Sequence, residues 1–227
     1  MEVEQTKIPD EELEVFKTLT LSGVVVDVGA REDIDMYGLR PDLEYHLFEP
    51  SNDFFAVLQE KTKGIPNIHI NNYGLSHKAG EGVYKVVEQS FRNYKSDGYP
   101  QKLRTLDQYC VENNITSIDF LKIDTEGYDF KVLAGAKDIL NHTKYIQFEY
   151  WDGVEKFHDM LSADFDMYLM MEPVLREEAY RGFQQNAQMI DIFKHTLVPL
   201  EPWLITVIDT CFIRGGFGGN VLCIRKP

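Results

Sequence analysis

Three acidic residues stand where short apolar segments end, and their spacing is the feature that most directly suggests chemistry. Asp27, Glu49 and Asp124 each close a run rich in Val, Ile, Leu or Phe. In open α/β sheets, ligands bind at the edge where the carboxyl ends of the strands meet. Carboxylates that face one crevice repel each other unless cations or hydroxyl donors lie between them. We therefore expect a ligand that carries positive charge, hydroxyl groups, or both.

The separation of Asp27 and Glu49 by 22 positions suggests a nucleoside cofactor whose vicinal ribose hydroxyls are held by Glu49. Two carboxylate oxygens match two adjacent hydroxyl donors. An NAD site has similar spacing, but it also needs the motif G-x-G-x-x-G to bring the backbone close to the pyrophosphate. In this chain Glu32 and Asp33 follow shortly after Gly29, and their negative charges would repel a pyrophosphate. A cofactor with a sulfonium and no phosphate suits this turn better, which favours S-adenosylmethionine.

Strands and helices alternate along the first two thirds of the chain. The patterns predict a lead-in helix at 10–19 and strands at 23–29, 45–50, 67–72, 118–124 and 145–150. Further helices are expected from 51 onward, over 105–113 and over 127–140. Ser51 is the expected cap of the second helix, and an inserted strand is expected at 83–87. Segments 165–171 and 220–224 are expected to pair as a terminal antiparallel hairpin. This alternation predicts an α/β fold with a mostly parallel sheet and helices on both faces.

Several of these segments resemble the FkbM family of S-adenosylmethionine-dependent methyltransferases. The resemblance rests on Val26–Ala30, Phe48–Pro50, Arg104–Asp107, Asp119–Gly127, Val132–Ala136 and Gln147–Glu149, with 119–127 the most specific. It implies a class I methyltransferase (Rossmann-like) fold with a seven-stranded sheet whose last strand is antiparallel. It also implies methyl transfer to a hydroxyl group of a sugar or small natural product.

The resemblance also implies roles for individual residues around the cofactor. Glu49 would hold the ribose, and Asp124 would form the floor beneath the sulfur. The residues expected at the methionine end are Asp27, Val28, Gly29 and Ala30, and those expected around the adenine are Asn72, Tyr73, Gly74 and Leu75. Pro50, next to Glu49, completes the expected cofactor site. The family usually has a further glycine after Gly29 and Ala30, which this chain lacks. Arg31 is the alternative partner for the methionine carboxylate.

Methyl transfer to an alcohol requires a base near the hydroxyl, because the neutral alcohol is a weak nucleophile. Asp124, Glu126 and Glu149 lie at the ends of segments expected to be adjacent strands, and we expect one of them to be the base, with Asp124 first. In the alternative, the three chelate a divalent cation that acidifies the hydroxyl. No metal site is assigned from the sequence. Trp151 and Tyr150, just past the strand, are candidates for stacking on a sugar ring.

Composition argues against several other classes of protein. The 227 residues carry 23 Lys+Arg and 37 Asp+Glu, a net charge of −14, which disfavours nucleic acid as a partner. Three cysteines without metal-ligand spacing fit a reducing, cytoplasmic setting. The first ten residues do not resemble a signal peptide, and no run has the length of a membrane span.

We expect one methyltransferase domain over residues 1–227. It would comprise the lead-in helix (1–20), a cofactor-binding core (23–150), and an acceptor-side region with the terminal hairpin (151–227). The expected partner is a small-molecule or saccharide acceptor. Two other interpretations stay open: a module that kept the nucleoside pocket as a sensor without catalysis, and a nicotinamide-dependent oxidoreductase, against which the acidic turn after Gly29 argues.

Overall fold

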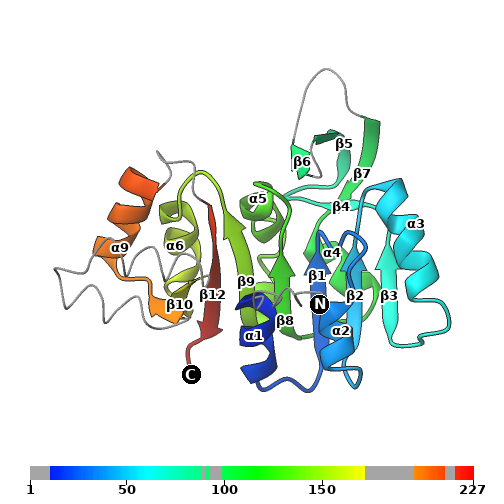
Figure 1. The fold of residues 1–227 in the computed structure, drawn as a ribbon, viewed down its shortest axis with the longest axis horizontal. Coiled ribbons are helices and arrows are strands. Elements are labelled where there is room, and N and C mark those ends of the chain that lie inside the picture. The colour runs from blue at the N-terminus through cyan, green and yellow to red at the C-terminus, as the bar shows by residue number, and fades with distance from the viewer. Residues whose placement is uncertain (1–10, 88–89, 93–98, 172–196, 213–217) are drawn as a thin grey trace, which may run out of the picture.

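The computed structural model describes residues 11–87, 90–92, 99–171, 197–212 and 218–227 (Figure 1). A central sheet has the strand order β11-β10-β12-β9-β8-β1-β2-β3. Its strands are β1 (Val24–Val28), β2 (Glu44–Phe48), β3 (Ile68–Asn71), β8 (Ile118–Ile123), β9 (Thr143–Tyr150), β10 (Phe165–Met170), β11 (Leu197–Pro199) and β12 (Gly219–Arg225). A smaller sheet, ordered β4-β7-β5-β6, holds β4 (Gly74–Leu75), β5 (Gly80–Val87), β6 (Ser90–Arg92) and β7 (Tyr99–Arg104).

The strand directions confirm the expected mostly parallel α/β sheet. β1, β2, β3, β8 and β9 pair in parallel, and β12 runs antiparallel between β9 and β10. The predicted antiparallel pairing of 165–171 with 220–224 is present, with Phe165 opposite Arg225. The two strands are not a hairpin, however, because β11 lies between them along the chain. The central sheet has one strand more than the seven expected, because the short β11 adds to its edge. The expectation for residues 172–196 and 213–217 lies outside the described residues.

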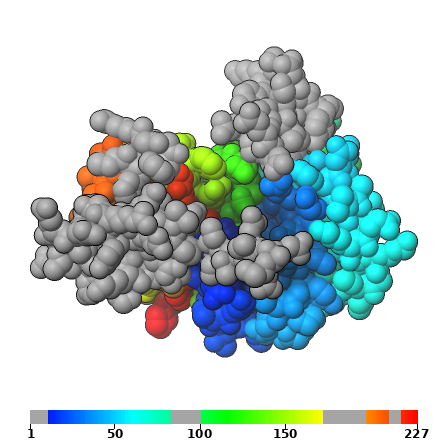
Figure 2. Space-filling view, viewed as in Figure 1, coloured from blue at the N-terminus to red at the C-terminus, as the bar shows by residue number. Residues whose placement is uncertain are grey.

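Helices cover both faces of the sheet, because neighbouring residues on each strand point to opposite sides. One face packs on α1 (Glu11–Thr18), α2 (Asp35–Leu39) and α3 (Asn52–Lys61), where Phe16 meets Phe120 edge-on at 5.1 Å. The other packs on α4 (Leu106–Glu112), α5 (Asp129–Leu133), α6 (Glu155–Leu161) and α9 (Pro202–Val207). In Figure 2 the green part of the chain lies between the blue-to-cyan N-terminal part and the orange part near the C-terminus.

Two local expectations from the sequence were wrong. Ser51 occupies the position before α3, but its side chain makes no cap hydrogen bond; its backbone N–H donates to Glu49 instead. The helix expected over 127–140 is only α5 and a separate 3₁₀ turn, η1 (Ile139–His142), because Gly127 adopts φ +95° and the chain passes Ser76 closely at Gly135. Thr105, by contrast, forms a capping box with Gln108 at the start of α4.

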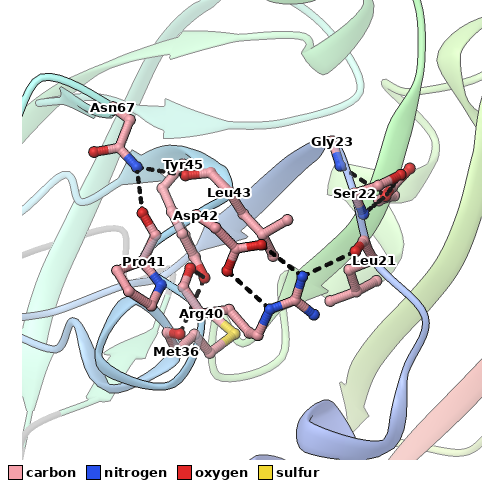
Figure 3. A network of polar contacts seen from close by, with 11 residues as sticks. Leu21, Ser22, Gly23, Met36, Arg40, Pro41, Asp42, Leu43, Tyr45 and Asn67 are labelled. Carbon is pink, nitrogen blue, oxygen red and sulfur yellow. Dashed lines mark hydrogen bonds and ion pairs between the residues drawn. The ribbon is translucent and has the colours of Figure 1, made fainter.

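The amino ends of the strands are joined by structural polar contacts (Figure 3). The Arg40 guanidinium donates to both Asp42 carboxylate oxygens, at 2.9 and 2.8 Å, and to the Leu21 carbonyl at 2.9 Å. The Tyr45 hydroxyl lies 3.0 Å from the Met36 carbonyl, and the Asn67 amide donates to Leu43 at 2.6 Å. These contacts connect the segments that precede β1, β2 and β3 at the amino ends of these strands. Among the described residues, no helix combines the length and apolarity needed to span a membrane.

Candidate active site

The carboxyl ends of β1, β2, β8 and β9 meet at one edge of the sheet, beside two cavities. The larger has a volume of about 550 Å³ and the smaller about 80 Å³. Gly29, Arg31 and Asp124 line both, so the two form adjoining parts of one site. The larger cavity is acidic, with seven carboxylates against the two cations Arg31 and Lys122: Glu11, Glu12, Asp27, Glu32, Asp33, Asp35 and Asp124.

Gly29 lies in the turn directly after β1 and contacts the ends of β2 and β8. Its φ of +93° lies in the region that favours glycine, and its N–H donates to the Phe48 carbonyl at 2.9 Å. A Cβ atom at this position would lie 1.8 Å from the Asp124 backbone oxygen. The turn therefore brings β1 against the end of β8 at a distance that only glycine permits. Arg31 follows with φ +52°, and its guanidinium stacks over the Phe54 ring at 5.0 Å.

Asp27 and Lys122 form the buried charged floor of the larger cavity. The Lys122 ammonium lies 3.1 Å from Asp124, 3.6 Å from Glu12 and 3.9 Å from Asp27. Burial alone would lower the pKa of Lys122, but the three carboxylates together raise it well above its usual range. Asp27 is 5% exposed, its Oδ1 has no hydrogen-bond partner, and burial raises its pKa to about 6 against the lowering effect of Lys122.

Glu49 is 1% exposed and lines the smaller cavity. Its carboxylate accepts from the backbone N–H groups of Arg31, at 2.9 Å, and Ser51, at 2.6 Å. Burial raises the pKa of Glu49 to about 7, although those two N–H groups lower it. Because a carboxylate offers about four lone-pair sites, two acceptor positions remain for a ligand.

The residues expected around an adenine fall into two groups. Tyr73, Gly74 and Leu75 line the smaller cavity together with Val28, Phe48 and Pro50. Asn72 is outside that lining, and its side-chain amide donates to Asn52 at 3.0 Å. Ala30 lines the larger cavity only. Most of the expected cofactor residues thus line the two cavities at one edge of the sheet, whereas Asn72 lines neither.

Asp124, Glu126 and Glu149 come together as expected from the strand ends. One carboxylate oxygen from each lies within 4.8 Å of the others. Burial raises the pKa of Glu149 to about 8, with Asp124 and Glu126 adding to the rise and the Trp151 hydrogen bond opposing it. Asp124 accepts a hydrogen bond from Lys122 at 3.1 Å, so its charge has a cationic partner.

Two residues that support this site were not singled out from the sequence. Asp129 is buried, and its carboxylate accepts from the Thr125 hydroxyl at 2.7 Å and the Glu149 N–H at 3.1 Å, which ties the ends of β8 and β9 together. Lys122 supplies the counter-charge for Asp27 and Asp124. A lysine inside the apolar run Phe120–Ile123 is the signal that could have found it, because a charge there needs partners.

Comparison with known proteins identifies the family. The profile of the methyltransferase FkbM domain matches residues 27–182. The 2-O-methyltransferase NoeI of Sinorhizobium fredii (strain NBRC 101917 / NGR234) is 25% identical over 154 residues, which cover 57% of this chain and 63% of that protein. The chain thus matches less than two thirds of the length of this relative.

Solved structures to which the chain is similar include an FkbM methyltransferase from Methylobacillus flagellatus KT and an rRNA methylase from Streptococcus thermophilus. The first is 18% identical, covers 68% of this chain and 44% of that chain, and has a TM-score of 0.45. The second is 11% identical, covers 99% and 100% of the two chains, and has a TM-score of 0.48. The family profile spans well over half of the sequence and includes the carboxyl ends of β1, β2, β8 and β9, so the chain belongs to the FkbM methyltransferase family.

Proposed function

We propose that this protein is an S-adenosylmethionine-dependent O-methyltransferase that acts on a hydroxyl group of a saccharide or small natural product. The observation that carries the proposal is the convergence of Glu126 and Glu149 on Asp124, which lines both cavities. Membership in the FkbM family supports methyl transfer, and the relative NoeI carries the name of an O-methyltransferase.

The charge of the larger cavity supports a cationic cofactor. Its seven carboxylates outnumber its two cations, and Asp27 presents a buried oxygen without a hydrogen-bond partner. A sulfonium or ammonium group would lower the electrostatic repulsion among these acids. In this proposal the methionine end occupies the larger cavity, and the adenosine occupies the smaller one, where Glu49 accepts from the ribose hydroxyls.

The proposed mechanism combines orientation with one base. The cofactor supplies an electrophilic methyl group when bound. Holding the acceptor oxygen in line can contribute about 7–11 kcal/mol, and a general base typically adds about 10²–10⁴-fold. The sequence favoured Asp124 as the base. We favour Glu149 instead, because burial raises its pKa to about 8, which suits proton abstraction near neutral pH, whereas Asp124 already accepts a hydrogen bond from Lys122.

A turnover assay tests the proposed activity. We expect the full chain to convert S-adenosylmethionine to S-adenosylhomocysteine in the presence of saccharide or polyol acceptors, and to bind S-adenosylhomocysteine in calorimetry. Binding without turnover over a broad acceptor panel would support a sensor instead, and binding of NAD alone would support an oxidoreductase. Turnover that persists in EDTA would favour the carboxylate base over the alternative in which the three acids share a divalent cation.

Replacing Glu49 by Ala should weaken S-adenosylhomocysteine binding by about 10- to 150-fold, the equivalent of a lost charge-assisted hydrogen bond of about 1.5–3 kcal/mol. Titration calorimetry measures the change. Glu60→Ala is the control, because Glu60 is exposed on α3 and pairs only loosely with Lys63 at 3.9 Å. Unchanged affinity in Glu49→Ala would contradict the ribose assignment.

The same site predicts a pH dependence of cofactor binding. The ionised Glu49 accepts from the diol, and its pKa is raised to about 7, so affinity should fall as the pH drops below 7. Glu49→Gln should lose the part of this dependence centred near pH 7, because the amide does not titrate. A variant with the unaltered profile would show that another group controls binding.

Trp151 is the candidate platform for a sugar acceptor. Its side chain is 39% exposed, and its Nε1–H donates to Glu149 at 2.6 Å, so the ring borders the proposed base. Aromatic rings stack on the apolar faces of sugars. We expect Trp151→Ala to raise the KM for a saccharide acceptor by about tenfold, a loss of about 1.4 kcal/mol, with the KM for the cofactor unchanged.

Trp151→Phe separates stacking from hydrogen bonding. Phe keeps an aromatic face but cannot donate to Glu149, so the acceptor KM should stay near the wild-type value while the kcat changes. Equal losses of acceptor affinity in the Ala and Phe variants would contradict the platform role.

A further inference from the structure

A second cluster of ligand-type side chains lies on β2 and β3, away from the proposed catalytic acids. His46 and His69 are directly opposite each other in the parallel register of the two strands. Glu44 is two residues before His46, so it lies on the same face of the sheet. β3 is the edge strand of the central sheet. The three side chains therefore meet across the last strand pair.

The three ligand atoms converge closely. Nε2 of His46 lies 3.2 Å from Oε1 of Glu44, and Nε2 of His69 lies 3.4 Å from the same oxygen. All three atoms lie within 4.8 Å of one another. A tetrahedral zinc site with bonds of about 2.0–2.1 Å has ligand–ligand edges of about 3.3–3.4 Å. Two of the three edges thus already match that geometry.

The other ring nitrogen of His46 has a hydrogen-bond partner of its own. Nδ1 of His46 lies 2.7 Å from the Tyr109 hydroxyl, which accepts from the Asn71 amide at 3.2 Å. With the proton on Nδ1, donated to Tyr109, Nε2 presents its lone pair to the cluster. Such second contacts fix the tautomer and ring orientation of metal-binding histidines.

Access to the cluster is open on one side. The His46 side chain is 4% exposed, whereas those of His69 and Glu44 are 48% and 50% exposed. The His46 and His69 rings stack at 4.7 Å with an interplanar angle of 19°. The exposed His69 ring can turn to direct its lone pair inward, and water can fill a fourth position.

We propose that Glu44, His46 and His69 bind a divalent first-row metal ion, with Zn²⁺ the ion that fits best. Imidazole nitrogens and a carboxylate are ligands that Zn²⁺ accepts, and three protein ligands plus water complete a tetrahedron. The ion clamps the edge strand β3 to β2. This site is independent of the proposed methyl transfer, because none of its ligands lines either cavity at the carboxyl edge.

The experiment uses the full chain, freed of metal by a chelator that is then removed. Titration calorimetry with ZnCl₂ should show one tight site, and thermal unfolding should shift to higher temperature with Zn²⁺, because the ion binds the folded state. His69→Ala and Glu44→Gln should each weaken binding by at least about 100-fold, since second-shell changes alone cost about 10–100-fold. Both residues are half-exposed, so both variants should fold.

His142→Ala is the matched control, because His142 is exposed and lies outside the cluster. It should bind Zn²⁺ with wild-type affinity. Absence of tight binding in the wild-type chain would overturn the proposal and leave the three side chains as a hydrogen-bonded group. Wild-type affinity in both His69→Ala and Glu44→Gln would overturn it as well, because the ion would then bind elsewhere.

Discussion

Gly29→Ala should destabilise the folded protein by more than about 4 kcal/mol, a loss in the range that only a few structural causes produce. The new Cβ would meet the backbone oxygen of Asp124 at 1.8 Å. That oxygen belongs to the backbone at the end of β8, so relief requires β1 and β8 to separate. Urea denaturation of the two proteins measures the difference.

The control for this substitution is Gly64→Ala. Gly64 also has a positive φ, +80°, but a Cβ there meets nothing within 4 Å. Its variant experiences only the backbone strain of the left-handed region, about 1–2 kcal/mol. If the two variants lose the same stability, the close approach of β1 to Asp124 does not constrain the site.

Gly29→Ala should also abolish binding of S-adenosylhomocysteine under conditions where the protein remains folded. Gly29 lines both cavities, and movement of β1 away from β8 displaces Asp27 from Lys122 across the strand pair. Calorimetry at low temperature separates this effect from unfolding. Retained affinity would show that the turn is not part of the cofactor site.

The fold could be predicted where local pattern decides the structure. The β-branched run 24–26 and the apolar run 118–123 predict buried parallel strands, and both are present as β1 and β8. The helix expected over 127–140 was wrong because backbone conformation at Gly127 and packing at Gly135 override a pattern of helical spacing. The short edge strand β11 depends on a partner far along the chain, so its own three residues carry too little signal.

The sequence predicted only those side-chain positions of the site that follow from where the strands end. The convergence of Asp124, Glu126 and Glu149 follows from the order of β8 and β9, and these side chains do lie together. The pairing of Lys122 with Asp27 depends on strand register, which the sequence does not show. The hydrogen bonds that Glu49 accepts from the backbone N–H groups of Arg31 and Ser51 likewise depend on the turn geometry. The contacts that could not be predicted are therefore those between segments far apart in the sequence.

Replacing Glu149 by Gln should lower kcat by about 10²–10⁴-fold, the usual contribution of a general base. The amide keeps an oxygen that can accept from the Trp151 Nε1–H, so the local geometry should persist. Affinity for S-adenosylhomocysteine should stay close to wild type, because Glu149 lines neither cavity. Rapid-quench measurement of methyl transfer with a bound acceptor reports the chemical step.

Asp152→Asn is the matched control for Glu149→Gln, since Asp152 is an exposed acid in the same loop and pairs with Lys156. Its kcat should equal that of the wild type. Asp124→Asn distinguishes the two candidate bases: it should alter cofactor binding more than the chemical step. Full activity of Glu149→Gln together with an inactive Asp124→Asn would assign the base to Asp124, as the sequence first favoured.

The pH dependence gives Glu149 a signature that a structural role would not produce. The base acts in its ionised form, and its pKa is raised to about 8, so kcat at saturating cofactor should rise with pH and level off above 8. Folding stability should change in the opposite direction. Because the folded pKa of about 8 lies above the usual 4.5, the native state binds more protons than the unfolded state between pH 4.5 and about 8. The stability of the folded state therefore falls as the pH rises through this range.

Glu149→Gln should remove the acid limb of the rate profile and should be more stable than the wild type above pH 8. A variant that keeps the rising limb would show that the titrating base is another group.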